Sequence, residues 1–220
     1  MYIKTILNQD GRLNSVAYYI FPNAVFKEDC KTYLDYCLNN VKFEEATTFK
    51  EGASDTYKPS DQYNEKSDIR NTSVGFLDYS HDLINNVVWS YIREANENFF
   101  KYDLNFFQEI QFAKYEVGDY YNWHQDSSSN KKADEQRKLS LTMSLTDDTE
   151  YEGGYLQFFN GERPIEVDNP DLLKYKSFER DIKSVGTVIV FDSLDWHRVT
   201  PVTKGVRYSL VCWCVGPNFV

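Results

Sequence analysis

Two stretches in the first half of the chain carry apolar residues at the spacing of an amphipathic helix. In residues 23–40 they recur every three or four positions between Val25 and Cys37, and residues 80–100 show the same spacing after Ser80, which we expect to cap that helix. Residues 47–68, between the two, are polar and lack periodicity. A stretch of this length favours a lid or a binding loop over a simple connection.

Beyond Asp103 the pattern changes to the alternation that is typical of strands. We predict strands at residues 107–117, 138–146, 153–159, 186–192 and 205–215, separated by turns rich in Asp, Gly and Pro. Short strands after flanking helices favour an α+β, mainly β, fold: a double-stranded β-helix (jelly-roll) core with flanking N-terminal helices. The predicted organisation is one domain over residues 1–220, with helical support and a lid region in 1–102 and the catalytic jelly roll in 103–216.

Length and charge narrow the classes of protein to consider. A chain of 220 residues suits one domain, and its net charge of −10 opposes binding to a nucleic-acid backbone. Acidic residues interrupt the one basic cluster, residues 130–138, so we expect a solvated loop there. No apolar run could span a bilayer and the first residues do not resemble a signal peptide, so we expect a cytoplasmic protein without membrane contact.

The four cysteines predict neither a metal site nor a redox site. Cys30 and Cys37 lie seven residues apart in the first predicted helix, and Cys212 and Cys214 share one face of a predicted strand. Neither pair has the C-x-x-C spacing of a zinc or thiol redox motif. We therefore expect free, buried thiols in a reducing compartment.

The segment YYNWHQDSSSN contains an H-x-D pair, His124 and Asp126, in a chain with three histidines. Alone, this pair is a weak motif and favours a solvated turn in the loop that leaves a strand. His197 makes a metal site the better interpretation, because it also follows a predicted strand and turn, in FDSLDWHRVTPV. Two imidazoles and one carboxylate form the facial triad that holds non-haem Fe(II) with three positions open, although a zinc hydrolase can use the same ligands.

An iron oxygenase and a zinc hydrolase differ in one requirement: the oxygenase needs a cation that binds a second carboxylate, that of its cosubstrate. In GVRYSLVCWCV, the period of two places Arg207 on the same strand face as Ser209, Val211 and Trp213. The guanidinium therefore lies in line with apolar and aromatic side chains, where its planar group suits bidentate binding of a carboxylate. This arrangement favours an iron oxygenase with a carboxylate cosubstrate.

With these residues the sequence resembles the Fe(II)/2-oxoglutarate-dependent dioxygenases, and within them the prolyl-4-hydroxylase-like group. The resemblance lies in AKYEVGDYYNWHQD, LSLTMSLTDDTEYEGGYLQFF and GTVIVFDSLDWHRVTPVTKGVRYSLVCWC, and more weakly in FPNAVFKEDCKTYL and DIRNTSVGF. These segments follow the order of the family and cover most of the chain from about Tyr18 to Cys214.

The resemblance implies a role for each matching residue at the metal and the cosubstrate. The Fe(II) ligands would be His124, Asp126 and His197. Arg207 would pair with the C5 carboxylate of 2-oxoglutarate. Tyr115 would hydrogen-bond the cosubstrate, and a hydroxyl from Thr142 or Ser144 would complete its site.

Further matches imply residues on the substrate side of the iron. These are Tyr121, Trp213 and Arg137. Val215 departs from peptide-binding members that carry a polar residue there. Many collagen-type members have lysine where this chain has Arg207, which leaves the subfamily open.

The implied activity is hydroxylation of a C–H bond with Fe(II), 2-oxoglutarate and O₂, and with ascorbate as an optional reductant. The expected partner is a protein or peptide substrate, with a peptidyl proline as the first candidate. An oxygenase of a small molecule or free amino acid and a non-catalytic metal-binding cupin remain alternatives. A nucleic-acid demethylase is disfavoured, because those relatives carry a second arginine six residues after the first, where this chain has Trp213. The sequence is silent on the oligomeric state.

Overall fold

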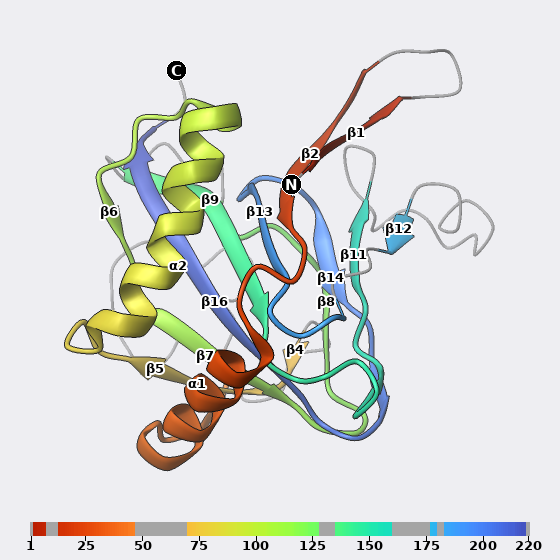
Figure 1. Ribbon diagram of the computed structural model, residues 1–220. Coiled ribbons are helices and arrows are strands. Elements are labelled where there is room, and N and C mark those ends of the chain that lie inside the picture. Colours follow the sequence, from red (N-terminus) through yellow and green to blue (C-terminus); the bar gives the residue numbers. More distant parts are fainter. Residues whose placement is uncertain are drawn as a thin grey trace, which may run out of the picture.

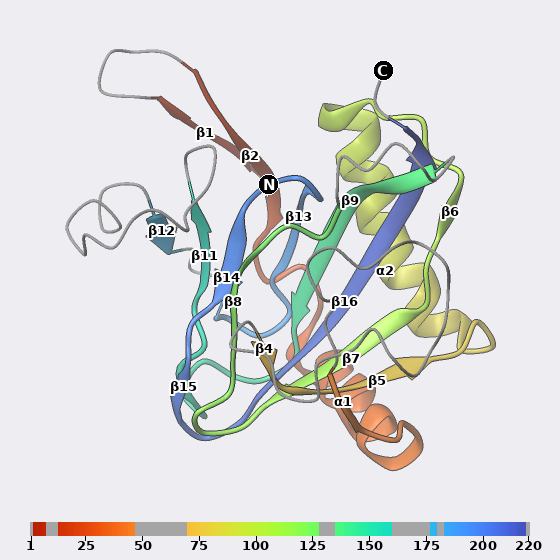
Figure 2. The same ribbon diagram turned by 180° about the vertical axis from the view of Figure 1, so that it is seen from behind.

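Two antiparallel sheets lie face to face in a computed structural model of the chain, with helices on the outer side of the larger sheet (Figure 1). The structure describes residues 2–7, 13–46, 70–127, 135–159, 177–179 and 183–218. Figure 2 shows the smaller sheet from behind. This arrangement confirms the predicted mainly β jelly roll with flanking helices.

The larger sheet contains nine strands in the order β1-β2-β13-β9-β16-β7-β5-β3, with β6 paired to β16. Their bounds are β1 Tyr2–Leu7, β2 Leu13–Phe21, β3 Glu44–Glu45, β5 Ser73–Leu77, β6 Phe106–Phe107, β7 Ile110–Tyr115, β9 Glu135–Ser144, β13 Val188–Asp192 and β16 Arg207–Pro217. The long central pair β9 and β16 runs in continuous register from Ser144 opposite Ser209 to Leu139 opposite Cys214. This pair therefore fixes how the residues of the sheet line up around the site.

The smaller sheet contains five strands in the order β12-β11-β14-β8-β4. Their bounds are β4 Arg70–Asn71, β8 Tyr120–His124, β11 Leu156–Phe159, β12 Ser177–Glu179 and β14 His197–Val199. A separate two-stranded ladder joins β10, Glu152–Gly153, to β15, Val202–Lys204. The smaller sheet matters most for function, because β8 and β14 carry both histidines of the predicted triad.

Two helices cover the outer face of the larger sheet (Figure 1): α1, Lys27–Asn40, and α2, Asp82–Ala95, which continues as a π-helical turn, Asn96–Phe100. Buried helix residues such as Cys30 and Ile92 share one hydrophobic core with Leu141 of β9 and Leu210 of β16. A second core fills the space between the sheets, where Phe158 of the smaller sheet packs with residues of β2, β7 and β13. The site lies on this second side.

The cysteine prediction is confirmed, because all four thiols are free and buried. No helix in the described part of the chain combines the length and the apolar character needed to cross a membrane. Residues 47–68, the predicted lid, lie outside the described residues.

Several local predictions were wrong. His81, not Ser80, caps α2, since its Nδ1 accepts a hydrogen bond from the backbone N–H of Ile84, while the Ser80 hydroxyl donates to Asp78. His124 ends strand β8 instead of lying in a loop, because it pairs with His197 across the ladder. The predicted loop at 130–138 includes the start of β9, which pairs with the end of β16.

The N-terminal region also contributes more strands than expected. Residues 1–102 were predicted as helical support and lid, yet β1, β2 and β3 belong to the larger sheet. The strand β5 was expected, because the family resemblance marks DIRNTSVGF as strand-like. The central part of β2 is buried on both faces, with Tyr18 and Tyr19 at 0% and 1% exposure. A strand buried on both faces reads as a continuous apolar run and lacks the alternation used to recognise strands.

Candidate active site

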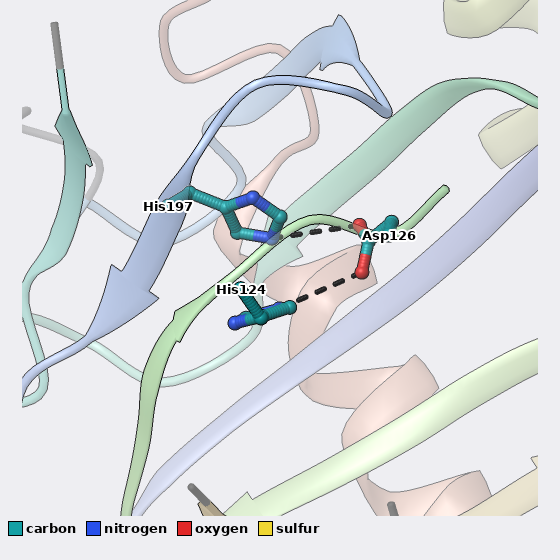
Figure 3. A group of neighbouring side chains, drawn as sticks. All are labelled: His124, Asp126 and His197. Carbon is teal, nitrogen blue, oxygen red and sulfur yellow. Dashed lines mark ion pairs between the residues drawn. The ribbon is translucent and has the colours of Figure 1, made fainter. Parts of the chain in front are cut away.

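The three predicted metal ligands converge at one end of the smaller sheet (Figure 3). His124 is the last residue of β8, His197 is the first of β14, and the two lie opposite each other in the antiparallel ladder. Asp126 follows β8 by two residues, and its backbone N–H donates to the carbonyl of Ser193. The ladder and this turn contact therefore bring together ligands that are 71 residues apart in sequence (197 − 126).

The donor atoms of the three side chains point at one another (Figure 3). Nε2 of His124 lies 3.5 Å from Oδ1 of Asp126, and Nε2 of His197 lies 3.5 Å from Oδ2 of the same carboxylate. All three donor atoms fall within 4.8 Å of one another. One metal ion could therefore contact all three.

Backbone carbonyls orient both imidazoles. Nδ1 of His124 lies 2.7 Å from the carbonyl oxygen of Asn122, and Nδ1 of His197 lies 2.8 Å from that of Asp195. A carbonyl only accepts hydrogen bonds, so each Nδ1 carries the proton and each Nε2 keeps its lone pair. A histidine that binds a metal commonly has its second nitrogen fixed in this way.

The electrostatics of the cluster suit deprotonated ligands. Burial lowers the pKa of His197 to about 4, and the nearby His124 lowers it too. Burial alone would raise the pKa of Asp126, but the electrostatic influence of His197, His124 and Arg137 holds it well below its usual range. At neutral pH the site therefore presents a neutral His197 imidazole and an ionised Asp126 carboxylate.

Two serines that sequence reasoning missed support the Asp126 carboxylate, Ser140 directly and Ser193 through Ser140. The Ser140 hydroxyl on β9 donates to Oδ2 of Asp126 at 2.7 Å and lies 2.8 Å from the hydroxyl of Ser193. Both serines are fully buried. The sequence gives Ser140 only as one position of an alternating strand, so its contact with the triad depends on how the two sheets pack.

Arg207 is the first residue of β16. It lies on the face of the larger sheet that is turned towards the smaller sheet, here called the site face, at the end away from Trp213 and Ser140. Its side chain is 3% exposed, Nη1 donates to the Ser209 hydroxyl at 3.0 Å, and its Cζ lies 5.2 Å from the ring centre of Tyr115. Within the described part of the chain no carboxylate forms an ion pair with it. Since a buried cation is costly unless it is paired, this guanidinium is suited to receive an anionic ligand.

Tyr151, a residue that the sequence did not single out, joins this end of the site. It is 3% exposed, and its hydroxyl hydrogen-bonds Ser144 and Arg207. Burial raises the pKa of Tyr151 although Arg207 lowers it. Of the two predicted hydroxyl donors, Ser144 therefore lies beside Tyr151 and Arg207. Thr142 lies two residues away from Ser144 on β9, opposite Val211.

The three predicted substrate-side residues lie around the triad. The ring of Tyr121 stacks on the His124 ring with centres 3.4 Å apart. Arg137 places its Cζ 3.8 Å from the ring centre of Trp213 and donates from Nε to Gln108. Arg70 of β4, which was not predicted, lies 4.4 Å above Tyr121. Tyr121 and Arg137 thus contact members of the triad and Trp213 contacts Arg137, while their role towards a substrate stays a prediction.

The site passes a simple chemical test for a divalent metal. Two imidazole nitrogens and one carboxylate are the donor set of the facial triad, which leaves coordination positions for further ligands. Zinc accepts the same donors, but a structural zinc site would need a fourth protein ligand. No further His, Cys, Asp or Glu of the described residues belongs to this group of donors.

Comparison with known proteins agrees with the geometry. The 2OG-Fe(II) oxygenase superfamily matches residues 110–215. A PKHD-type hydroxylase of Synechococcus sp. (strain CC9902) is 34% identical over 106 residues, which cover 47% of this chain and 40% of that protein. A PKHD-type hydroxylase of Thermosynechococcus vestitus is 35% identical over 108 residues, 47% of this chain and 41% of its own. The match therefore spans less than half the length of these curated relatives.

Solved structures share the fold at low sequence identity. A Pseudomonas putida prolyl-4-hydroxylase has a TM-score of 0.61 and 17% identity, covering 91% of this chain and 92% of its own. A Trichoplax adhaerens prolyl hydroxylase in complex with a hypoxia inducible factor peptide fragment has a TM-score of 0.63 and 18% identity, covering 90% and 82%. Residues 110–215 thus match the 2OG-Fe(II) oxygenase superfamily, and the chain has a prolyl-4-hydroxylase-like fold.

Proposed function

We propose that the chain hydroxylates a C–H bond of a protein or peptide side chain, with a peptidyl proline as the first candidate. The family implies Fe(II) as the metal, with 2-oxoglutarate and O₂ as cosubstrates. His124, Asp126 and His197 would hold the metal. Arg207 would receive the distal carboxylate of 2-oxoglutarate.

One observation carries this proposal: the metal-binding cluster, held by the smaller sheet, contacts the larger sheet at Ser140, and the buried Arg207 lies on the same face of the larger sheet. Along β16 the site face runs from Arg207 through Ser209 and Val211 to Trp213. Trp213 lies opposite Ser140, whose hydroxyl binds Asp126. A dicarboxylate held by the metal could extend along this face towards the guanidinium of the long Arg207 side chain.

The residues around the metal site would then each have a definite role. The carbonyls of Asn122 and Asp195 keep the imidazoles in the metal-binding tautomer, and Ser140 keeps the carboxylate in place. Bound Fe(II) with 2-oxoglutarate and O₂ would supply the oxidant, releasing succinate and CO₂ as the C–H bond becomes C–OH. The apolar residues of the second core keep water away from the inner wall of the site.

The names of the similar proteins support a polypeptide substrate. The curated relatives are called PKHD-type hydroxylases, and the Trichoplax adhaerens enzyme was solved with a peptide. The site of this chain offers aromatic and cationic side chains, Tyr121, Trp213 and Arg137, beside the triad. The cytoplasmic location, the optional role of ascorbate and the lack of a nucleic-acid partner stay predictions.

The test is succinate formation by the iron-loaded protein with proline peptides, free amino acids and cell lysate, followed by mass spectrometry of the products. His124→Ala and Asp126→Ala should abolish Fe(II)-dependent turnover while circular dichroism shows the fold intact. His81→Ala is the matched control, because His81 caps α2 outside the metal site, and it should turn over normally. Unimpaired turnover in either triad variant would refute the assignment, and metal binding without any succinate would favour the non-catalytic cupin.

A further inference from the structure

A second row of side chains crosses the site face of the larger sheet beside the triad. Val211 of β16 lies opposite Gln111 of β7, and Gln111 lies opposite Phe76 of β5. Cross-strand partners point to the same side of a sheet. Their neighbours Val74, Ala113 and Tyr115 belong to the core between the sheets, so this row faces the smaller sheet and the site.

The amide of Gln111 is the unusual member of the row. The residue is only 5% exposed, yet no described residue hydrogen-bonds its side chain. The amide nitrogen and oxygen of Gln111 are not fully buried, so they form part of the small exposed area of the residue. With so little access to water the amide has few hydrogen bonds to lose, so a ligand that pairs with it would bind with a gain.

The chemistry of that amide selects its partner. A glutamine side chain offers an N–H donor and a C=O acceptor side by side, which matches the N–H and C=O of a main-chain amide. A free amino acid instead carries a charged ammonium and a charged carboxylate, and a single neutral amide balances neither charge. Gln111 is therefore better matched to a peptide than to a free amino acid.

Phe76 extends the row to the open edge of the site. It lies on the same face as Val74 and is 53% exposed, whereas Leu77, on the opposite face, is buried under the helices. An exposed aromatic ring beside a polar anchor is suited to packing against a substrate side chain. The row thus runs from the metal side outward as Val211, Gln111 and Phe76.

Strand spacing sets how far this row lies from the metal. Ser140 marks the triad on β9, and β16 separates β9 from β7. Gln111 lies two strand spacings, about 10 Å, across the sheet from Ser140 and two residues, about 7 Å, along it, because Gln111 pairs with Val211 and Ser140 with Trp213. The separation is therefore about 12 Å, and Phe76 lies about 5 Å further. An extended peptide advances roughly 3.3 Å per residue, so Gln111 would meet a residue about three or four positions from the one at the metal.

We infer that Gln111 and Phe76 form the floor of an extended-peptide groove, in which the Gln111 amide pairs with a main-chain amide of the substrate and Phe76 packs against the side chain that follows. This inference rests on the proposed function. It makes Gln111 a specificity-determining residue that favours polypeptides over free amino acids and small molecules.

Peptide length provides the test. Under anaerobic conditions, with Fe(II) and 2-oxoglutarate bound, binding is measured for a capped nonapeptide pool with a central proline and for its capped central tripeptide. The wild-type protein should bind the nonapeptide pool at least fivefold more tightly. Gln111→Met, which keeps side-chain length but lacks the amide, should weaken nonapeptide binding about five- to tenfold and change tripeptide and 2-oxoglutarate binding less than twofold.

Phe76→Ala should also weaken nonapeptide binding several-fold. Phe26→Ala is its matched control, because Phe26 is 77% exposed at the start of α1, away from the site, and should have no effect. Equal binding of nonapeptide and tripeptide, or no peptide binding, would overturn the groove. Weaker 2-oxoglutarate binding with unchanged peptide binding in Gln111→Met would instead assign Gln111 to the cosubstrate.

A nonapeptide pool with central alanine separates this inference from the proposed function. Gln111 and Phe76 contact flanking residues, so their variants should weaken binding of the alanine pool as well. Succinate formation should occur with the proline pool only. If neither pool is turned over while the variant effects on binding persist, proline hydroxylation fails and the groove stands.

Discussion

Gly154 packs directly against the side chain of Arg207. A β-carbon at Gly154 would lie 3.0 Å from Cδ of Arg207 and 3.1 Å from Cγ2 of Val202, and the residue has a φ of +60°. We predict that Gly154→Ala displaces the guanidinium and weakens 2-oxoglutarate binding roughly tenfold, as measured by anaerobic calorimetric titration of the Fe(II)-loaded protein.

Gly118→Ala separates displacement of Arg207 from backbone strain. Gly118 has a φ of +93°, but an added β-carbon would meet nothing within 4 Å. Both variants should lose about 1–2 kcal/mol of unfolding free energy through the left-handed backbone. Only Gly154→Ala should lose cosubstrate affinity; an equal loss in both would show that Arg207 is not displaced.

Removal of the Arg207 charge should have a larger effect than its displacement. Arg207→Leu is expected to raise the Kd for 2-oxoglutarate about 10- to 100-fold, because charge-assisted hydrogen bonds contribute about 1.5–3 kcal/mol. Arg207→Lys should lose less, since it keeps the charge but not the planar, bidentate group. Arg93→Leu, an exposed cation on α2, controls for the general effect of making the chain more acidic and should leave the Kd unchanged.

Ser140→Ala should weaken metal binding without removing a ligand. The Ser140 hydroxyl holds Oδ2 of Asp126, and residues that orient metal ligands typically contribute 10–100-fold in affinity. We expect about a tenfold loss in the affinity for Mn(II), used as a stable substitute and measured by titration. Ser90→Ala, on the exposed side of α2, should bind Mn(II) as the wild type does, and an unchanged affinity in Ser140→Ala would show that Asp126 needs no such support.

The sequence predicted the parts of this site that depend on local pattern. The period of two along β16 correctly placed Arg207, Ser209, Val211 and Trp213 on one face, because alternation alone decides that face. The H-x-D spacing and the later histidine identified a triad before any pairing was known. These features need no information about distant segments.

The parts that could not be predicted depend on packing between distant segments. Ser140 meets Asp126 only because the two sheets stack in one particular register. Tyr151 meets Arg207 because the segment before β10 packs against Gly205, just before β16. Gly154 reads in sequence as a turn glycine, and its contact with Arg207 appears only in the folded chain. Strand pairing is set by such non-local contacts, which a single sequence does not reveal.

The four thiols should be inert in the folded protein. Burial raises the pKa of Cys30 to about 11 and that of Cys37, Cys212 and Cys214 to about 12. Because the thiolate is the reactive form, we predict no reaction with Ellman's reagent at pH 8 in the native state and four reactive thiols in guanidinium chloride. Fast labelling of even one native thiol would contradict the burial of all four.

The same shifts predict how stability depends on pH in the alkaline range. The unfolded thiols lose their protons near pH 9, whereas the folded ones keep theirs until about pH 11 or 12. The unfolded state therefore gains stability first, so the contribution of the thiols to stability is complete below pH 9 and is lost as the pH rises towards 11. Urea unfolding at pH 8 and pH 10 should show a lower midpoint at pH 10. Cys37→Ala should reduce this difference, because one of the four buried protons is then absent, and an identical difference in both proteins would mean that other groups cause it.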